Sequence, residues 1–502
     1  MVMGRVRATS YVRRTLSQPV HKPRVSSVIL PHPPQAPAGS AGPGGTGSRG
    51  ISDQLDDAVC HLTTGAGAPS RQLHLGLLSE GWNSLGGGEG SGSFIPSSAD
   101  SRVIDEEAED PDDDEYRFTL KEDLQRIWSM LACRLNLLLF FVPLSFWSVL
   151  GSGSPLFVFI CNFLALIPLA SLLGNATEEL ALHTGEIIGG LLNATFGNAV
   201  EMIMSVQALR VGLLSVVQGT MLGSILSNLL LVLGMSFFAG GIRYHVQKFN
   251  EKGATCSVTL LLLSCMSIVI PTVAASGNDH ANPTYDIIKI SRTIAVLIGV
   301  TYCLFLFFQL YTHLNLFRDD EEGEEGWPSM SWEAATVMLF IVTLLIAVHS
   351  EYLVGSIHDV VTNYGLPESF IGVILLPIVG NAAEHLTAVT VAMKNKVDLA
   401  MGVAVGSSAQ IALFVFPFTV CAGWVLDQPL TLAVQPMSAL VLLMAVLVAM
   451  AIVQDGESNW LEGVMLMAAY LMIAIVFWYT DPNSSSGHSG PSGRKEAGVP
   501  GA

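Results

Sequence analysis

The pentapeptide GNAVE, residues 197–201, lies inside a long apolar segment, and GNAAE, residues 380–384, lies inside another one 183 residues later. The match continues without a gap beyond the pentapeptides. A Gly-Ser pair follows 26 residues after the first Gly of each copy, at Gly223-Ser224 and at Gly406-Ser407. Matches held at one offset over this length predict that the chain is internally duplicated, and that each half carries one copy of the same feature.

The composition places both copies in a membrane protein. Half of the 502 residues are apolar and only 13% are charged, whereas about a quarter of the residues of a soluble domain are charged. From residue 135 onward, apolar segments recur that are each long enough to cross a hydrocarbon core of ~30 Å as a helix. We predict an all-α multi-pass membrane protein with about eleven transmembrane helices, at 135–151, 155–173, 186–209, 214–239, 256–274, 292–313, 332–354, 367–393, 398–423, 431–453 and 459–479.

The helix count predicts how the two halves are related. Residues 155–316 and 331–480 each contain five predicted helices, and the first helix lies outside this pair. Because five is odd, the second half enters the membrane from the opposite side, which gives two inverted five-helix repeats. Six Lys and Arg residues of short loops against three favour a cytosolic N-terminus.

The remaining segments are polar. We predict a disordered cytosolic tail over 1–116 that contains the acidic run 105–115, an amphiphilic lead-in together with the first transmembrane helix over 117–151, an acidic cytosolic loop over 317–330 and a disordered tail over 481–502. The basic residues 1–50 fit either a transit peptide or a basic tail. The net charge of −18 comes largely from the acidic runs and argues against a nucleic-acid partner. Seven Cys without a CxxC pair indicate neither a disulfide scaffold nor a zinc site.

Glu201 and Glu384 end the two pentapeptides, at the depth of the hydrocarbon core. A charged carboxylate at a helix centre is penalised by about 2.5–3.5 kcal/mol on insertion scales, so such a group usually faces a cavity and a partner. A lone Glu could instead be protonated and bonded to a neighbour. Two carboxylates at matching positions of inverted halves favour a shared site over that alternative.

The residues around these carboxylates offer oxygen atoms. Asn198 and Asn381 each precede a Glu by three positions, so amide and carboxylate share one helix face. The hydroxyl groups of Ser224 and Ser407 follow on the next helix of each half, and Asn228 and Gln410 add amides. Oxygen ligands suit hard cations such as Ca²⁺. Because empty carboxylates are costly at this depth, protons would replace a departing cation, which is how an antiporter works.

At these residues the sequence resembles the Ca²⁺/H⁺ exchanger (CAX) family of the cation/Ca²⁺ antiporter superfamily. The two signatures are similar to GGLLNATFGNAVEMIMSVQAL, residues 189–209, and GNAAEHLTAVTVAMKNKVDLAMGVAVGSSAQIALFVF, residues 380–416. The resemblance extends over about 120–480 and includes GNATEELALHTGE, residues 174–186. It implies an inverted two-half bundle in an organelle membrane, most often a vacuole, that moves cytosolic Ca²⁺ inward in exchange for lumenal protons.

The resemblance also implies roles for residues. Glu201 and Glu384 would be the shared Ca²⁺ and proton sites, with Ca²⁺ and H⁺ as transported ions and no cofactor. The residues that would support the ion are Asn198, Asn381, Ser224, Ser407 and Gln410. Candidates for second carboxylates near the cytosolic entrance are Glu178, Glu179 and Glu351. Six acidic residues could concentrate cations there or form a solvated linker, namely Asp319, Asp320, Glu321, Glu322, Glu324 and Glu325.

Several alternatives stay open at this point. The chain could be an exchanger that prefers Mn²⁺ or couples to Na⁺ or K⁺. A cation channel or an intramembrane hydrolase could also carry paired carboxylates, but neither predicts matched Gly-Ser partners. We therefore expect a transporter and not an enzyme. Its expected partners are Ca²⁺, protons and the lipid bilayer, and the sequence leaves a homo-oligomer open.

Overall fold

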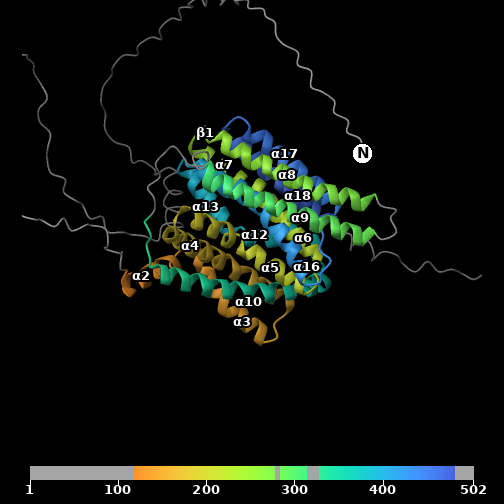
Figure 1. The fold of residues 1–502 in the computed structure, drawn as a ribbon. Coiled ribbons are helices and arrows are strands. Elements are labelled where there is room, and N and C mark those ends of the chain that lie inside the picture. The colour runs from red at the N-terminus through yellow and green to blue at the C-terminus, as the bar shows by residue number, and fades with distance from the viewer. Residues whose placement is uncertain (1–117, 278–282, 314–326, 481–502) are drawn as a thin grey trace, which may run out of the picture. The chain divides into compact units, whose positions relative to one another are not determined.

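The computed structural model describes residues 118–277, 283–313 and 327–480, and these residues are almost entirely helical (Figure 1). The acidic run 105–115, the acidic residues 319–325 and both predicted tails lie outside the described residues. Before the first half lie α2 (Leu120–Leu131), a 3₁₀ turn (Arg134–Phe140) and α3 (Phe141–Leu150). The first half contains α4 (Pro155–Phe196), α5 (Ala199–Arg210), α6 (Leu214–Leu226), α7 (Leu233–Arg243), α8 (Glu251–Ser276) and α9 (Pro283–Phe307).

The second half is built in the same way from shorter pieces. It contains α10 (Trp332–Tyr364), α11 (Glu368–Phe370), α12 (Leu376–Gly380), α13 (Ala382–Met393), α14 (Val397–Met401), α15 (Ser407–Gln410), α16 (Phe416–Val425), α17 (Pro436–Val453) and α18 (Trp460–Tyr479). π-helical turns continue or join these helices at Ser227–Val232, Phe308–Thr312, Ile371–Leu375, Gly402–Gly406 and Ile411–Val415. Within the described chain, the only strands are the two-residue β1 (Gln247–Lys248) and β2 (Glu457–Ser458), which pair antiparallel.

The lengths of the helices confirm a multi-pass membrane protein. Eight helices in the described residues are long and apolar enough to cross a membrane, and the number rises to eleven if each of three bent helix pairs is one span. The bent pairs are Leu120–Leu131 with Arg134–Leu150, Ile187–Phe196 with Ala199–Arg210, and Glu368–Gly380 with Ala382–Met393. The upper count equals the predicted one.

The second segment of the first bent pair, Arg134–Leu150, agrees with the predicted first helix 135–151. The chain turns by 88° between α2 and the following segment, so α2 does not continue into the first span. Leu120, Leu124 and Trp128 are exposed and lie four residues apart on one face of α2, whereas Asp123 and Met130 are buried. An amphipathic helix that turns away from a spanning segment is typical of a helix lying along the membrane surface.

The helix α4 is longer than the predicted span 155–173, because it continues to Gly185 before it breaks. Gly185 has φ +76° and ψ 169°, a conformation that only glycine adopts without strain. Beyond this residue the chain starts the shorter helix that leads to Asn198. In Figure 1, α4 lies beside α10, the equivalent first helix of the second half, and the two pack against each other.

Small residues bring the two halves together next to the pentapeptides. A Cβ atom on Gly219 would lie 3.4 Å from the backbone of Gly372, and one on Gly223 would overlap the backbone carbonyl of Val373. Helix α6 of the first half therefore packs backbone to backbone against the segment that precedes GNAAE. Close approach through small residues is how helices associate in membranes, where lipid competes for apolar side chains.

Candidate cation site

Both pentapeptides lie where a membrane helix bends. The bends are 42° at the first pentapeptide and 58° at the second. Asn198 (φ −104°, ψ 15°) and Asn381 (φ −91°, ψ 15°) leave the helical conformation in nearly the same way. Each Asn precedes a new helix whose third residue is the Glu. The positive end of the helix dipole therefore lies beside each carboxylate and offsets part of the cost of its charge.

The Glu201 carboxylate is enclosed at this bend. Glu201 is 1% exposed, and neither of its carboxylate oxygens has a hydrogen-bond partner in the described part of the protein. A Cβ atom on Gly380 would collide with this carboxylate. Only glycine leaves room there, so the carboxylate of the first half rests against the helix break of the second.

Glu384 completes the pair from the other half. Its side chain is half-buried, and its Oε2 atom is buried without a hydrogen-bond partner among the described residues. Glu384 follows Gly380, the residue that faces the Glu201 carboxylate, by four positions, so both side chains come from the same contact between the halves. The structure thus brings together the two residues that the repeat predicted, and it leaves their negative charges unbalanced by any described Lys or Arg ion pair.

The two Asn side chains tie each pentapeptide to the opposite half. Asn198 Nδ2 donates to Gln410 Oε1 at 2.8 Å and to the carbonyl of Ala194 at 3.0 Å. Asn381 Nδ2 donates to the carbonyl of Ser224 at 3.3 Å. Four of the predicted supporting residues therefore form two pairs, Asn198 with Gln410 and Asn381 with Ser224. Each pair joins the first half to the second.

Several further oxygen atoms at this place have no partner. Ser224, Asn228 and Asn381 are all 0% exposed. The Ser224 hydroxyl, both polar atoms of the Asn228 amide and Asn381 Oδ1 form no hydrogen bond with any described residue. Buried polar groups are normally bonded, because an unpaired one costs free energy. Carboxylate, amide and hydroxyl oxygens without partners on these segments are of the kind that a hard divalent cation takes as ligands.

The other polar residues near the pentapeptides are already engaged or half-buried. His385 Nε2 lies 3.1 Å from Ser227 Oγ, so its imidazole is directed at a hydroxyl rather than at the carboxylate pair. Ser407 is half-buried, whereas the next residue, Ser408, is buried and donates to the carbonyls of Ala404 and Ile225. Among the described residues no group of three or more His, Cys, Asp and Glu could hold a metal ion, so any bound cation depends on the amide and hydroxyl oxygens as well.

Sequence reasoning missed Ser205. Its hydroxyl is buried without a partner among the described residues, and it lies on α5 one turn after Glu201, on the same helix face. The equivalent position of the second half is Ala388, so the repeat gave no signal for it. The π-helical turns at Ser227–Val232 and Gly402–Gly406 were also not predicted, although such turns are frequent at functional sites.

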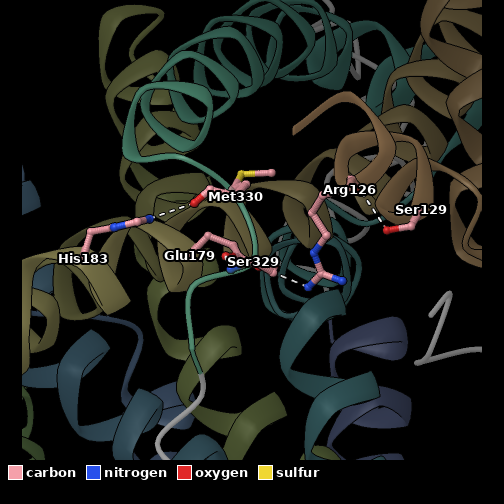
Figure 2. Close-up of polar contacts among 6 residues, drawn as sticks. All are labelled: Arg126, Ser129, Glu179, His183, Ser329 and Met330. Atoms are coloured by element: carbon pink, nitrogen blue, oxygen red, sulfur yellow. Dashed lines mark hydrogen bonds and ion pairs between the residues drawn. The ribbon is translucent and has the colours of Figure 1, made fainter. Parts of the chain in front are cut away.

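The three candidate entrance carboxylates have different surroundings. Glu178 and Glu351 are exposed. Glu179 is 5% exposed, and its carboxylate is bonded to Arg126 and Ser329 (Figure 2). None of these contacts reaches Glu201 or Glu384. The acidic residues 319–325 lie outside the described residues, so their attraction for cations stays a prediction.

The chain is similar to known membrane transport proteins over both of its halves. The family model described as sodium/calcium exchanger protein matches residues 154–311 and 334–479. The vacuolar calcium ion transporter of Schizosaccharomyces pombe is 43% identical over 353 residues, which cover 70% of this chain and 86% of that protein. A Ca²⁺/H⁺ antiporter of Aphanothece halophytica is 41% identical over 358 residues, which cover 68% and 95% of the two chains.

Two solved exchanger structures are also similar to this chain. The crystal structure of the Ca²⁺/H⁺ antiporter protein YfkE is 38% identical, superimposes with a TM-score of 0.59, and covers 70% of this chain and 99% of its own. A second exchanger structure, that of an H⁺/Ca²⁺ exchanger, shares the fold with a TM-score of 0.54 at 15% identity. The matched residues include both bent segments and both carboxylates, and the family that the signatures predicted is confirmed: this chain belongs to the sodium/calcium exchanger protein family.

Proposed function

We propose that this protein is a secondary active antiporter that sequesters Ca²⁺ by exchanging cytosolic Ca²⁺ for lumenal protons across a vacuolar membrane. One observation carries the proposal: at the contact of the two halves Glu201 lies against Gly380, four residues before Glu384, and both carboxylates have buried oxygens without partners among the described residues. Relatives named for Ca²⁺/H⁺ exchange and for the vacuole support both the pair of ions and the location.

Charge balance gives the exchange mechanism. Two carboxylates compensate the charge of one Ca²⁺, and the amide and hydroxyl oxygens of Asn381 and Ser224 complete its ligands. When Ca²⁺ leaves, two carboxylates at the depth of the hydrocarbon core cannot both stay charged at low cost, so they take up protons. The site then crosses the membrane loaded with either Ca²⁺ or protons. Because the empty charged site is the costly one, movement of one ion is coupled to movement of the other.

The contacts of α2 support the predicted orientation. Asp123 of α2 accepts hydrogen bonds from the backbone and the hydroxyl of Ser331, both at 2.7 Å. The segment that follows the N-terminal tail and the segment that follows the acidic loop therefore lie on the same side of the membrane. In our proposal this side is the cytosol, as the distribution of Lys and Arg predicts.

The experiment that tests the proposal is Ca²⁺ uptake by the purified protein in vesicles with an acidic interior. We expect uptake that requires the proton gradient and stops when an ionophore collapses it. Replacing Na⁺ and K⁺ by an impermeant organic cation should leave uptake unchanged. Uptake that persists without a proton gradient would contradict the exchanger, and uptake that requires Na⁺ or K⁺ would assign a different coupling ion.

The same vesicles can identify the preferred cation. Carboxylate, amide and hydroxyl oxygens favour Ca²⁺ over transition metals that prefer nitrogen or sulfur ligands. Competition by Mn²⁺ and Mg²⁺ against Ca²⁺ uptake would measure this preference. We expect unlabelled Ca²⁺ to reduce the uptake of labelled Ca²⁺ more strongly than Mn²⁺ or Mg²⁺ does. The site offers many oxygen ligands, which suits Ca²⁺, whereas Mg²⁺ gives up its water ligands reluctantly.

A further inference from the structure

A second group of polar side chains lies apart from the cation site and joins three segments that are distant in the sequence. We call Asp123, Arg126, Glu179, Ser329 and Ser331 the clasp. Arg126 Nη2 lies 3.1 Å from Glu179 Oε1. The backbone of Ser329 donates to Glu179 Oε2 at 2.9 Å, and the Ser329 hydroxyl donates to Glu179 Oε1. Figure 2 shows both partners converging on the one carboxylate.

The clasp also holds the beginning of α10. Ser331 is the N-cap residue of α10 and accepts from the backbone of Ala334 at 3.2 Å. The same serine is bonded twice to Asp123 of α2. One residue further back along the chain, the Met330 carbonyl lies 2.8 Å from His183 Nε2 of α4. Three consecutive residues before α10 are thus each bonded to α2 or α4.

Packing alone does not hold α2 in this place. An apolar cavity of about 620 Å³ lies between α2, α3, α4 and α10, and it is lined in part by Ile127 and Leu131 of α2. The outer face of α2 is exposed at Gln125 and Trp128. With a cavity on one side and an exposed face on the other, the polar contacts of Asp123 and Arg126 fix the position of the helix.

The clasp lies close to the break in α4. Glu179 and His183 occupy the last two turns before Gly185, where the helix breaks. The chain that follows leads directly to Asn198 and Glu201. The clasp therefore anchors the end of α4 from which the chain continues to Glu201. It also anchors the start of α10, the first helix of the second half, to this end of α4.

The charge of Glu179 is already balanced. Its side chain is 7% exposed, that of Arg126 is 34% exposed, and three donors from two residues bind the carboxylate. A carboxylate that serves as a cation ligand needs free oxygens, as Glu201 has. We propose that Glu179 is a positioning residue that binds no Ca²⁺. Together with Arg126 it anchors α2 and the start of α10 to α4. The end of α4 at Gly185, where the helix breaks, therefore keeps its position during exchange.

This inference rests on the proposed function, since its first test measures transport. We would determine KM and maximal rate of Ca²⁺ uptake for Glu179→Gln, Arg126→Met, their double variant and Arg126→Lys. We expect both single variants to lower the maximal rate roughly tenfold, as the loss of a hydrogen bond to a charged group allows, and to leave KM unchanged. The double variant should be no worse than either, because both changes break one interaction. Arg126→Lys keeps the charge and should restore most of the rate.

A cation-binding Glu179 predicts the opposite pattern. Glu179→Gln would then raise KM at an unchanged maximal rate, and Arg126→Met would lower KM by removing a competing positive charge. Either result would overturn the inference. Gln125→Ala, on the exposed face next to Arg126, is the matched control and should behave like the wild type. If the wild type itself shows no proton-dependent uptake, the proposed function fails, and the clasp is judged by the next measurement.

Hydrogen exchange tests the clasp without transport. We expect Glu179→Gln to increase amide exchange both in 120–131 and in 327–335, while 199–210 around Glu201 stays as protected as in the wild type. Gln125→Ala should change neither segment. Unchanged exchange in 120–131 and 327–335 would show that Glu179 does not anchor them and would overturn the inference.

Discussion

Glu179 and Glu201 are both buried carboxylates of the first half, 5% and 1% exposed, but their surroundings are opposite. Glu179 is bonded by Arg126 and Ser329, whereas both oxygens of Glu201 lack partners among the described residues. Burial alone therefore does not identify a cation site. A buried carboxylate with a complete set of donors holds segments together, and one whose oxygens are free is available to a cation or a proton.

The largest expected effect removes the free carboxylates. Glu201→Gln or Glu384→Gln should each reduce proton-driven Ca²⁺ uptake to the background of empty vesicles, because an amide neither balances the charge of Ca²⁺ nor carries a proton. Uptake at a rate like that of the wild type in either variant would place the ion elsewhere. Glu179→Gln, which retains measurable uptake in our account, gives the direct comparison.

The next effect comes from the contact between the halves. Gly380→Ala places a methyl group against the Glu201 carboxylate and should lower the affinity for Ca²⁺ about tenfold, which corresponds to the cost of a small misplacement of ligands. The matched control is Gly402→Ala, since a Cβ atom there meets nothing within 4 Å. Equal KM values for the two variants in the uptake assay would show that Glu201 does not bind at this contact.

Thermal unfolding in detergent should distinguish the two carboxylates, because replacing Glu179 should lower the Tm and replacing Glu201 should not. Without Ca²⁺, Glu179→Gln should lower Tm, because it leaves Arg126 and Ser329 without their acceptor at a cost of about 1–3 kcal/mol. Glu201→Gln should keep or raise Tm, because neither oxygen of this carboxylate has a hydrogen-bond partner among the described residues that the change would remove. Added Ca²⁺ should raise Tm of the wild type and of Glu179→Gln, but not of Glu201→Gln. A lower Tm for Glu201→Gln without Ca²⁺ would contradict the distinction.

The smallest effect concerns the supporting amides. Asn198→Ala removes the hydrogen bond to Gln410 and should raise KM for Ca²⁺ a few-fold at a similar maximal rate, which corresponds to about 1 kcal/mol. Gln410→Ala should give a similar change, and the double variant should add little to either. Fully additive effects would indicate that the two side chains act separately.

The candidate cation site has signals in the sequence that are local and repeated. The apolar lengths gave the spans, and the fixed offset between GNAVE and GNAAE indicated two matched halves. The cost of a carboxylate in hydrocarbon then singled out Glu201 and Glu384. In the structure Glu201 lies against Gly380, four residues before Glu384, and which ion each carboxylate binds stays a prediction.

The clasp could not be predicted because its partners share no pattern. Arg126, Glu179 and Ser329 come from three segments separated by 53 and 150 residues, and nothing in the sequence links an Arg in a lead-in helix to a Ser before α10. The sequence grouped Glu179 with Glu178 as an entrance candidate, since adjacent acidic residues look alike until their neighbours are known. Ser205 was missed for a similar reason, because only its burial beside Glu201 distinguishes it.

The most direct test of the central claim is proton release on Ca²⁺ binding, measured with a pH indicator in weakly buffered detergent solution. If Ca²⁺ and protons share the carboxylates of Glu201 and Glu384, adding Ca²⁺ to the wild type and to Glu179→Gln should release protons. Glu201→Gln and Glu384→Gln should release none. Undiminished proton release from either of these two variants would contradict a single site shared by the two ions.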